Sequence, residues 1–173
     1  MIYIVRHGQT DWNLEGRYAG RIDILLNSMG IEQANKIKEE LKNIKFDKVF
    51  SSPLKRAYET AQIISNNEII EDDRLIERSN GDLEGKLKTD ITHKVDFNDP
   101  NLDEFNIESI IDFRKRIKSF FDEITTLYKD KNILVVTHAG VGIYARCYFE
   151  GEPLDKDYSK YKIKNCEVIS YNN

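Results

Sequence analysis

The sequence predicts an α/β fold, a three-layer sandwich in which helices flank a mainly parallel central sheet. Short runs rich in β-branched residues occur at 2–5, 48–51, 69–71 and 133–137. Segments with helical spacing of apolar residues lie between them. Strands and helices that alternate in this way form parallel sheets covered on both faces. The first and last runs are almost continuously apolar, as is typical of buried parallel strands.

Two segments show clear helical periodicity. In 29–43, apolar side chains recur every three to four residues, which indicates an amphipathic helix. The stronger stripe lies in 109–128 and consists of Ile110, Phe113, Ile117, Phe120, Phe121, Ile124 and Leu127. We interpret both stripes as faces that pack on the sheet.

A third helix is expected over 53–65, with Ser52 as its N-cap and Pro53 as its first residue. Proline is favoured there because its missing N–H has no partner at a helix start in any case. Residues 162–171 are expected to add a strand at the edge of the sheet.

The chain length fits a single domain spanning 1–173. A chain of 173 residues with 40% hydrophobic residues buries about 70% of its unfolded surface on folding. The stretch 86–107 has scattered charges and little periodicity, so it is predicted to be an inserted loop and a possible lid over a site.

Charge and composition exclude several kinds of partner. The 26 Lys and Arg nearly balance 30 Asp and Glu, and the net charge of −4 gives no global field for nucleic acid or an anionic membrane. No stretch approaches the roughly 20 apolar residues of a membrane span, so we expect a cytoplasmic protein. Cys147 and Cys166 are predicted to be reduced core thiols. No residue spacing indicates a metal site, and nothing in the sequence predicts the oligomeric state.

Chemically active residues follow three of the predicted strands. Arg6, His7 and Gly8 end the first, Arg56 lies one turn beyond the second, and His138 follows the fourth. Ligands of open α/β sheets bind beyond the carboxyl ends of the strands. Two imidazoles and two guanidiniums brought together there require an anion, and a phosphoryl group fits arginine's planar fork. Gly8 would let the backbone approach that anion.

A neutral imidazole is a competent nucleophile, and His7 could attack phosphorus directly. Arg6 and Arg56 should lower its proton affinity and keep it unprotonated. The leaving oxygen then needs a proton, for which Glu77 is the candidate because it directly follows the third strand. Asp82 and Glu84 lie nearby in sequence and remain alternatives.

The segment Val5-Arg-His-Gly-Gln-Thr-Asp-Trp-Asn13 resembles the signature of the histidine phosphatase superfamily, the phosphoglycerate mutase-like proteins. The resemblance continues in order through 16–23, 29–34, 51–57, 77–85 and 136–140. It implies a phosphoglycerate mutase-like fold, with His7 as the phosphoryl acceptor and Glu77 as the proton donor. Arg6, Arg56 and His138 would hold the phosphoryl oxygens. The implied substrate site comprises Arg6, Gly8, Asn13, Gly20, Arg56, Glu77, His138 and Ala139.

Ala139 stands where members of this family usually have glycine, and its methyl group could narrow the site. The resemblance further implies a metal-independent phosphoric monoester hydrolase of the histidine acid phosphatase type. Such an enzyme forms a phosphohistidine, needs no cofactor and acts on a small phosphorylated metabolite. The first alternative is phosphoglycerate mutase-type transfer, which must keep water from the phosphohistidine. Only the segment 86–107 could cover the site. A mutase would need more extensive covering segments, so this favours the hydrolase. A less favoured alternative is a non-catalytic phosphate-binding protein.

Overall fold

The computed structural model describes residues 1–93 and 95–172. Within these residues the chain forms one five-stranded sheet in the order β3-β2-β4-β1-β5. The strands β1 (Ile2–Arg6), β2 (Lys48–Ser51), β3 (Ile69–Glu71) and β4 (Ile133–Thr137) run parallel to one another. The edge strand β5 (Val168–Tyr171) pairs antiparallel with β1. The predicted mainly parallel sheet is confirmed.

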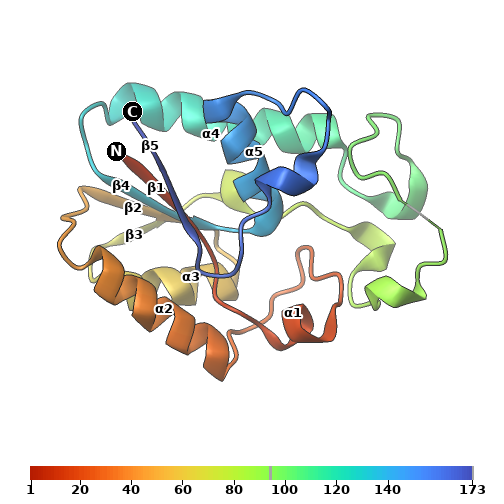
Figure 1. Ribbon diagram of the computed structural model, residues 1–173, viewed down its shortest axis with the longest axis horizontal. Coiled ribbons are helices and arrows are strands. Elements are labelled where there is room, and N and C mark those ends of the chain that lie inside the picture. Colours follow the sequence, from red (N-terminus) through yellow and green to blue (C-terminus); the bar gives the residue numbers. More distant parts are fainter. Residues whose placement is uncertain (94, 173) are drawn as a thin grey trace.

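Helices cover both faces of this sheet (Figure 1). The helices α2 (Ser28–Leu41) and α3 (Lys55–Ile64) lie on one face, while α4 (Ile110–Leu127) and α5 (Ala139–Glu150) lie on the other. A short helix α1 (Asp11–Glu15) follows β1. The described residues also contain 3₁₀ turns at Asp73–Leu75, Gly81–Leu83, Lys88–Asp90, Glu104–Asn106 and Tyr158–Tyr161. The three-layer prediction is therefore correct.

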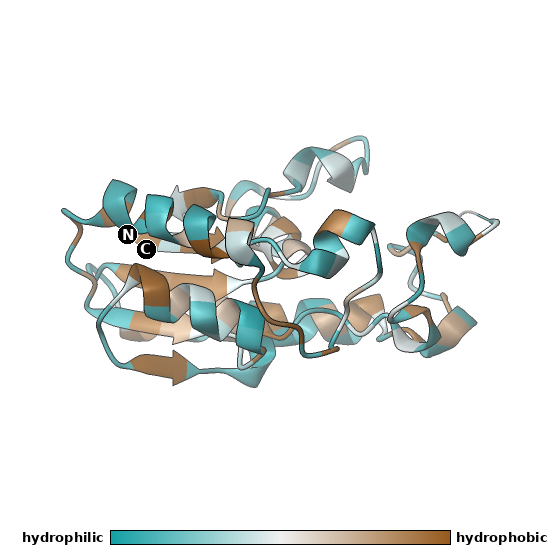
Figure 2. Cartoon of the chain, turned by 90° about the horizontal axis from the view of Figure 1, so that it is seen from below, coloured by the Kyte–Doolittle hydropathy of each residue, from teal (hydrophilic) through white to brown (hydrophobic). Residues whose placement is uncertain are grey.

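Side chains that point alternately to the two faces of the central strands divide the core into two layers. Ile133 and Val135 of β4 pack with the α4 and α5 side chains, whereas Leu134 and Val136 pack with those of α2 and α3. All four are fully buried. In Figure 2 the strands appear as brown, hydrophobic ribbons between helices that carry both teal and brown segments. This alternation follows from the period of two along a strand.

The predicted start of the helix after β2 is wrong. The helix begins at Lys55, and Leu54 takes the N-cap position without a side-chain hydrogen bond. Ser52 still belongs to the sheet edge, because its N–H donates to the Val136 carbonyl oxygen at 3.0 Å. Residues 53 and 54 form a bend between the strand and the helix, so Ser52 lies two positions before the N-cap. Its hydroxyl is left for a different contact, described below.

The predicted edge strand is shorter than expected. Within the described residues, Val168–Tyr171 alone pairs with β1 as a strand, and 162–167 is irregular with a turn at 165–166. Cys166 adopts a positive φ of 54° just before the strand. It is buried, Cys147 on α5 is half-buried, and both are free thiols. Burial raises the pKa of Cys147 to about 11 and that of Cys166 to about 12.

The segment 86–107 is a loop with two 3₁₀ turns, as predicted, although position 94 lies outside the described residues. Its place as a lid within one domain stays a prediction. None of the described helices is long and apolar enough to cross a membrane.

Candidate active site

The carboxyl ends of β1, β2 and β4 meet at one edge of the sheet. The register pairs Arg6 with Thr137, and the N–H of His7 continues it by donating to the Thr137 carbonyl oxygen at 2.9 Å. Ser52 extends β2 beside β4 in the same way. The rings of His7 and His138 consequently lie 5.2 Å apart, centroid to centroid. The predicted convergence of the two histidines is confirmed.

His7 is held in one tautomer. Its Nδ1–H donates to the carbonyl oxygen of Gly8 at 2.7 Å, because a carbonyl can only accept. The proton is therefore on Nδ1, and the lone pair is on Nε2. Nε2 has no hydrogen-bond partner among the described residues. Burial first, then the charges of Arg56 and Arg6, hold the pKa of His7 well below its ordinary value. A neutral imidazole with a free Nε2 is the form required of a nucleophile.

The two predicted arginines, Arg6 at the end of β1 and Arg56 in the first turn of α3, are anchored by backbone carbonyls. Arg6 donates to Ile163 at 3.0 Å, and Arg56, which is 1% exposed, donates to Ile22 at 2.8 Å and Gly20 at 2.7 Å. The Nε atoms of Arg6 and Arg56 are buried and have no partner within the described residues. Burial lowers the pKa of both groups, and nearby Glu77 opposes this. Buried donors without partners are costly, so an anion at this point would satisfy them.

His138 is fully buried behind His7 and is not part of the cavity wall. Its Nε2 lies 2.7 Å from the hydroxyl oxygen of Ser52, the contact that replaces the predicted helix cap. Its Nδ1 is buried without a partner in the described residues. Burial, and then the charges of Arg56, His7 and Arg6, hold its pKa well below the ordinary value. Contact with a phosphoryl oxygen stays a prediction for His138, and Nδ1 is the atom available for it.

Two backbone amides orient the carboxyl group of Glu77. The N–H of Arg78 donates to Oε1 at 2.9 Å, and the N–H of Gly140 donates to Oε2 at 3.0 Å. A Cβ atom on Gly140 would lie 2.4 Å from Oε1, so a side chain at this position on α5 would displace the Glu77 carboxyl group. Asp82 and Glu84 do not line the cavity, whereas Glu77 does. The structure therefore favours Glu77 among the three acids considered from sequence.

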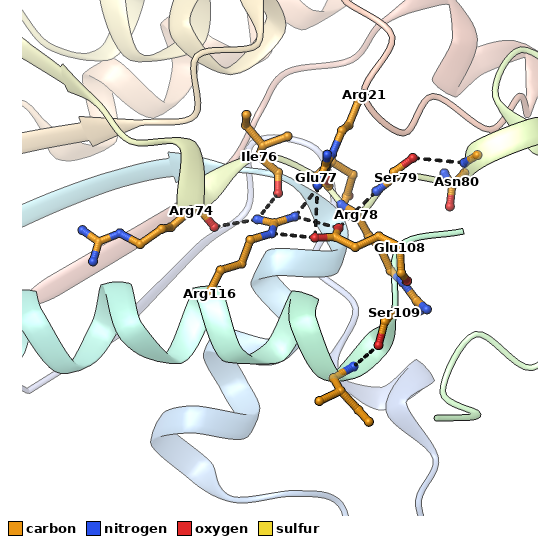
Figure 3. Close-up of polar contacts among 12 residues, drawn as sticks. Arg21, Arg74, Ile76, Glu77, Arg78, Ser79, Asn80, Glu108, Ser109 and Arg116 are labelled. Carbon is orange, nitrogen blue, oxygen red and sulfur yellow. Dashed lines mark hydrogen bonds and ion pairs between the residues drawn. The ribbon is translucent and has the colours of Figure 1, made fainter. Parts of the chain in front are cut away.

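A partly buried arginine on α4 supports the segment that carries Glu77 (Figure 3). Arg116 donates to the carbonyls of Arg74 and Ile76, both at 2.6 Å, and to that of Glu77 at 3.2 Å. The same guanidinium forms two hydrogen bonds with Glu108, at 2.9 and 3.0 Å. Burial tends to raise the pKa of Glu108, but Arg116 and then Arg21 outweigh it, and the pKa lies below its ordinary value. Arg116 thus ties the loop before the acid to helix α4.

These groups surround a cavity of about 600 Å³. Its wall includes Arg6, His7, Asn13, Gly20, Arg56, Glu77 and Ala139. The methyl group of Ala139, the first residue of α5, therefore faces the site as the sequence suggested. In Asn13, Oδ1 accepts from the Thr10 N–H and from Asn165 Nδ2, each at 3.2 Å. Its Nδ2 has no partner among the described residues, and so it stays available as a donor.

The structure explains the glycine at position 8 differently from the sequence-based prediction. A Cβ atom on Gly8 would lie 2.5 Å from the carbonyl oxygen of Gly30 in α2. Its N–H donates to Thr60 at 3.0 Å, and Gly8 does not line the cavity. The glycine permits close packing of β1 against α2 and, through its carbonyl, orients His7.

Sequence reasoning missed several residues of this site. Gly140 could have been found, because it closes the 136–140 segment that resembles the family. The hydroxyl of Ser52 was assigned to a helix cap instead. Arg78, only 7% exposed, donates to the carbonyls of Glu108 and Phe97 and lines the cavity. Neither Arg78 nor Arg116 carried a signal that separates it from a solvated helix or loop cation. No group of three His, Cys, Asp or Glu side chains suited to a metal occurs among the described residues.

The family model of the histidine phosphatase superfamily (branch 1) matches residues 2–172. The chain belongs to this superfamily. It is 33% identical to phosphoserine phosphatase 1 of Hydrogenobacter thermophilus over 98% of this chain and 83% of that protein. It is 35% identical to phosphoglycerate mutase-like protein 4 of Arabidopsis thaliana over 90% of this chain and 74% of that one.

The fold of this histidine phosphatase superfamily member is similar to that of a solved relative. A phosphoserine phosphatase from Entamoeba histolytica, crystallised as a mutant in complex with phosphoserine, superposes with a TM-score of 0.85. The two sequences are 26% identical, and the match covers 96% of this chain and 87% of the other. The family and the fold expected from the sequence are therefore confirmed.

Proposed function

We propose that this protein hydrolyses a small phosphomonoester in two steps, through a phosphohistidine on Nε2 of His7. The observation that carries the proposal is the orientation of His7. Its Nδ1–H is committed to the Gly8 carbonyl, so the lone pair on Nε2 belongs to a buried imidazole beside two arginines. Phosphatases among its relatives, including phosphoserine phosphatase 1, support the same reaction class.

In the first step, Nε2 of His7 attacks phosphorus and the bond from phosphorus to the ester oxygen breaks. The carboxyl group of Glu77 gives its proton to that leaving oxygen. Arg6 and Arg56 donate to the phosphoryl oxygens and offset the charge that develops on them. Asn13 Nδ2 and His138 Nδ1 are further donors. Gly20 serves indirectly, because its carbonyl anchors Arg56 at 2.7 Å.

In the second step, water attacks the phosphohistidine while Glu77 accepts a proton from it. The bond between phosphorus and Nε2 breaks, inorganic phosphate leaves, and neutral His7 is regenerated. The low pKa of His7, caused by burial and the two arginines, keeps the imidazole unprotonated below neutral pH. Activity of the histidine acid phosphatase type follows from this property.

The test is phosphate release from p-nitrophenyl phosphate and 3-phosphoglycerate in the presence of a chelator. We expect release by the wild type, loss of it in His7→Ala, and a phosphorylated enzyme that is stable in alkali but labile in acid. His93→Ala is the matched control, because His93 is an exposed histidine that pairs with Glu104 on the loop. Formation of 2-phosphoglycerate with little free phosphate would instead indicate a mutase. Full activity of His7→Ala would refute the proposal.

A further inference from the structure

The turn that precedes β5 lies against the end of β1 (Figure 1). The side chain of Arg6 donates to the carbonyl oxygen of Ile163, 157 residues later in the chain, at 3.0 Å. The carbonyl oxygen of Arg6 accepts from the N–H of the buried Cys166 at 2.9 Å. Asn165 lies between these two points of attachment, so its position relative to the strand end is fixed by the backbone.

The side-chain amide of Asn165 donates to two oxygens of the site. Its Nδ2 lies 2.9 Å from the carbonyl oxygen of His7 and 3.2 Å from Oδ1 of Asn13. A carbonyl can only accept, so the orientation of the Asn165 amide is determined. The reversed amide would place oxygen against oxygen at both contacts. Asn165 is not part of the cavity wall, and any effect on a bound ligand must pass through these neighbours.

Asn165 helps to decide which end of the Asn13 amide faces the cavity. Oδ1 of Asn13 accepts from Asn165 and also from the N–H of Thr10 at 3.2 Å. Asn13 lines the cavity, and its Nδ2 has no partner among the described residues. If this amide were reversed, its NH₂ group would meet two donors and its oxygen would face the ligand. An oxygen there would repel a phosphoryl group, whereas Nδ2 donates to it.

The other contact of Asn165 does not hold the nucleophile alone. Its partner, the His7 carbonyl, belongs to the peptide unit whose N–H, on Gly8, donates to the hydroxyl of Thr60 at 3.0 Å. The ring of His7 is oriented separately, by the Gly8 carbonyl. Without Asn165 this peptide unit therefore keeps its anchor on Thr60, while Asn13 keeps only the N–H of Thr10.

We infer that Asn165 is a positioning residue that acts through Asn13: it holds the donor end of the Asn13 amide toward the phosphoryl group. This inference rests on the proposed function, since Asn13 is expected to bind the phosphoryl group of the substrate. Loss of Asn165 lets the Asn13 amide turn, and the site then loses a donor although no group that touches the ligand has been removed.

The affinity for inorganic phosphate, measured by calorimetry, tests this role without requiring turnover. We expect Asn13→Ala to weaken binding by about 10- to 100-fold and Asn165→Ala by about five- to tenfold. In the Asn13→Ala background, Asn165→Ala should change the affinity less than about twofold, because the residue through which it acts is gone. Asn165→Leu keeps a branched side chain without a donor and should match Asn165→Ala. It provides a second variant if one of the two is shown by urea unfolding not to fold.

Asn67→Ala is the matched control. Its Nδ2 also donates to a backbone carbonyl, that of Phe46 at 2.8 Å, but before β2 and β3 and so at the opposite edge of the sheet. This variant should lower the urea midpoint and leave phosphate affinity unchanged. With p-nitrophenyl phosphate, Asn165→Ala should raise KM by more than it lowers kcat, because His7 keeps its other anchors.

The outcomes separate this inference from the proposed function. Wild-type affinity in both Asn165 variants, equal losses with and without Asn13, or a wild type that does not bind phosphate would overturn it. The expected pattern of phosphate affinities in a protein that releases no phosphate from esters would refute the hydrolase and support the role of Asn165.

Discussion

Arg116 offers a direct test of how the fold positions the proposed acid, through the substitution Arg116→Met. Methionine keeps much of the side-chain length but removes five hydrogen bonds, three to the carbonyls of 74, 76 and 77 and two to Glu108. Among the described residues, the carboxylate of Glu108 then keeps Arg21 at 3.0 Å and the Ser79 N–H at 3.3 Å as its partners. The loop that carries Glu77 thereby loses its main connection to helix α4.

The expected loss of stability in Arg116→Met follows from how far the ion pair is buried. Removing one partner of a buried ion pair costs about 3–5 kcal/mol. The side chains of Arg116 and Glu108 are 17% and 13% exposed, so water compensates in part, and we expect a loss of about 2–4 kcal/mol. Urea unfolding at neutral pH measures this as a lower midpoint with an unchanged slope.

The effect on catalysis separates positioning from stability. A nitrophenolate leaves without a proton, whereas the alkoxide of glycerol 3-phosphate needs one from the acid. Arg116→Met should therefore lower kcat more for glycerol 3-phosphate than for p-nitrophenyl phosphate. Arg74→Met is the control, because this arginine lies on the same loop and its guanidinium pairs with Asp72 and with Glu123 of α4, but it does not contact the Glu77 backbone. A loss below about 1 kcal/mol, or equal losses of kcat with both esters, would refute this reasoning.

Three further variants or conditions test the site. Glu77→Gln should lower kcat for alkyl esters by about 10²- to 10⁴-fold and for p-nitrophenyl phosphate much less; equal losses would exclude Glu77 as the acid. Gly140→Ala places a Cβ atom 2.4 Å from Glu77 Oε1, so steady-state assays should show the same leaving-group dependence while the urea midpoint changes little.

The pH dependence of stability provides the third test. Below pH 6.5 His7 and His138 bind protons in the unfolded chain, but they stay unprotonated in the folded protein because burial lowers their pKa values. The free energy of unfolding should therefore fall by up to about 1.4 kcal/mol per pH unit for each histidine. Above pH 6.5 the two make no contribution. Urea titrations at pH 5.0–7.5 measure this slope, and an undiminished slope in His7→Asn would contradict the assignment.

The sequence predicted the sheet and the strand ends because both depend on local patterns. The strand 133–137 is apolar at its first four positions, and a parallel sheet brings the residue after it, His138, to the same edge as His7. The start of α3 was misplaced because Ser52 and Pro53 satisfy the rules for a helix start equally well as a strand end. Only the pairing of Ser52 with β4 decides between these possibilities.

Long-range contacts account for what the sequence could not show. Arg116 looks in sequence like any cation on the polar side of an amphipathic helix, and its role depends on carbonyls about 40 residues earlier. Such roles arise where distant segments meet, so residue type and spacing do not predict them.

The arginines of this site link two properties that mutation cannot separate. Arg56 lowers the pKa of His7 and is the donor expected to hold the phosphoryl group. An anion bound between Arg6 and Arg56 offsets their charge, so the imidazole becomes more basic as the substrate arrives. Loss of Arg56 would weaken binding, raise the proton affinity of the free His7 and release the Gly20 and Ile22 carbonyls together. The proposed nucleophile is thus kept neutral in the empty site by burial and by the same arginine charges that are expected to bind its substrate.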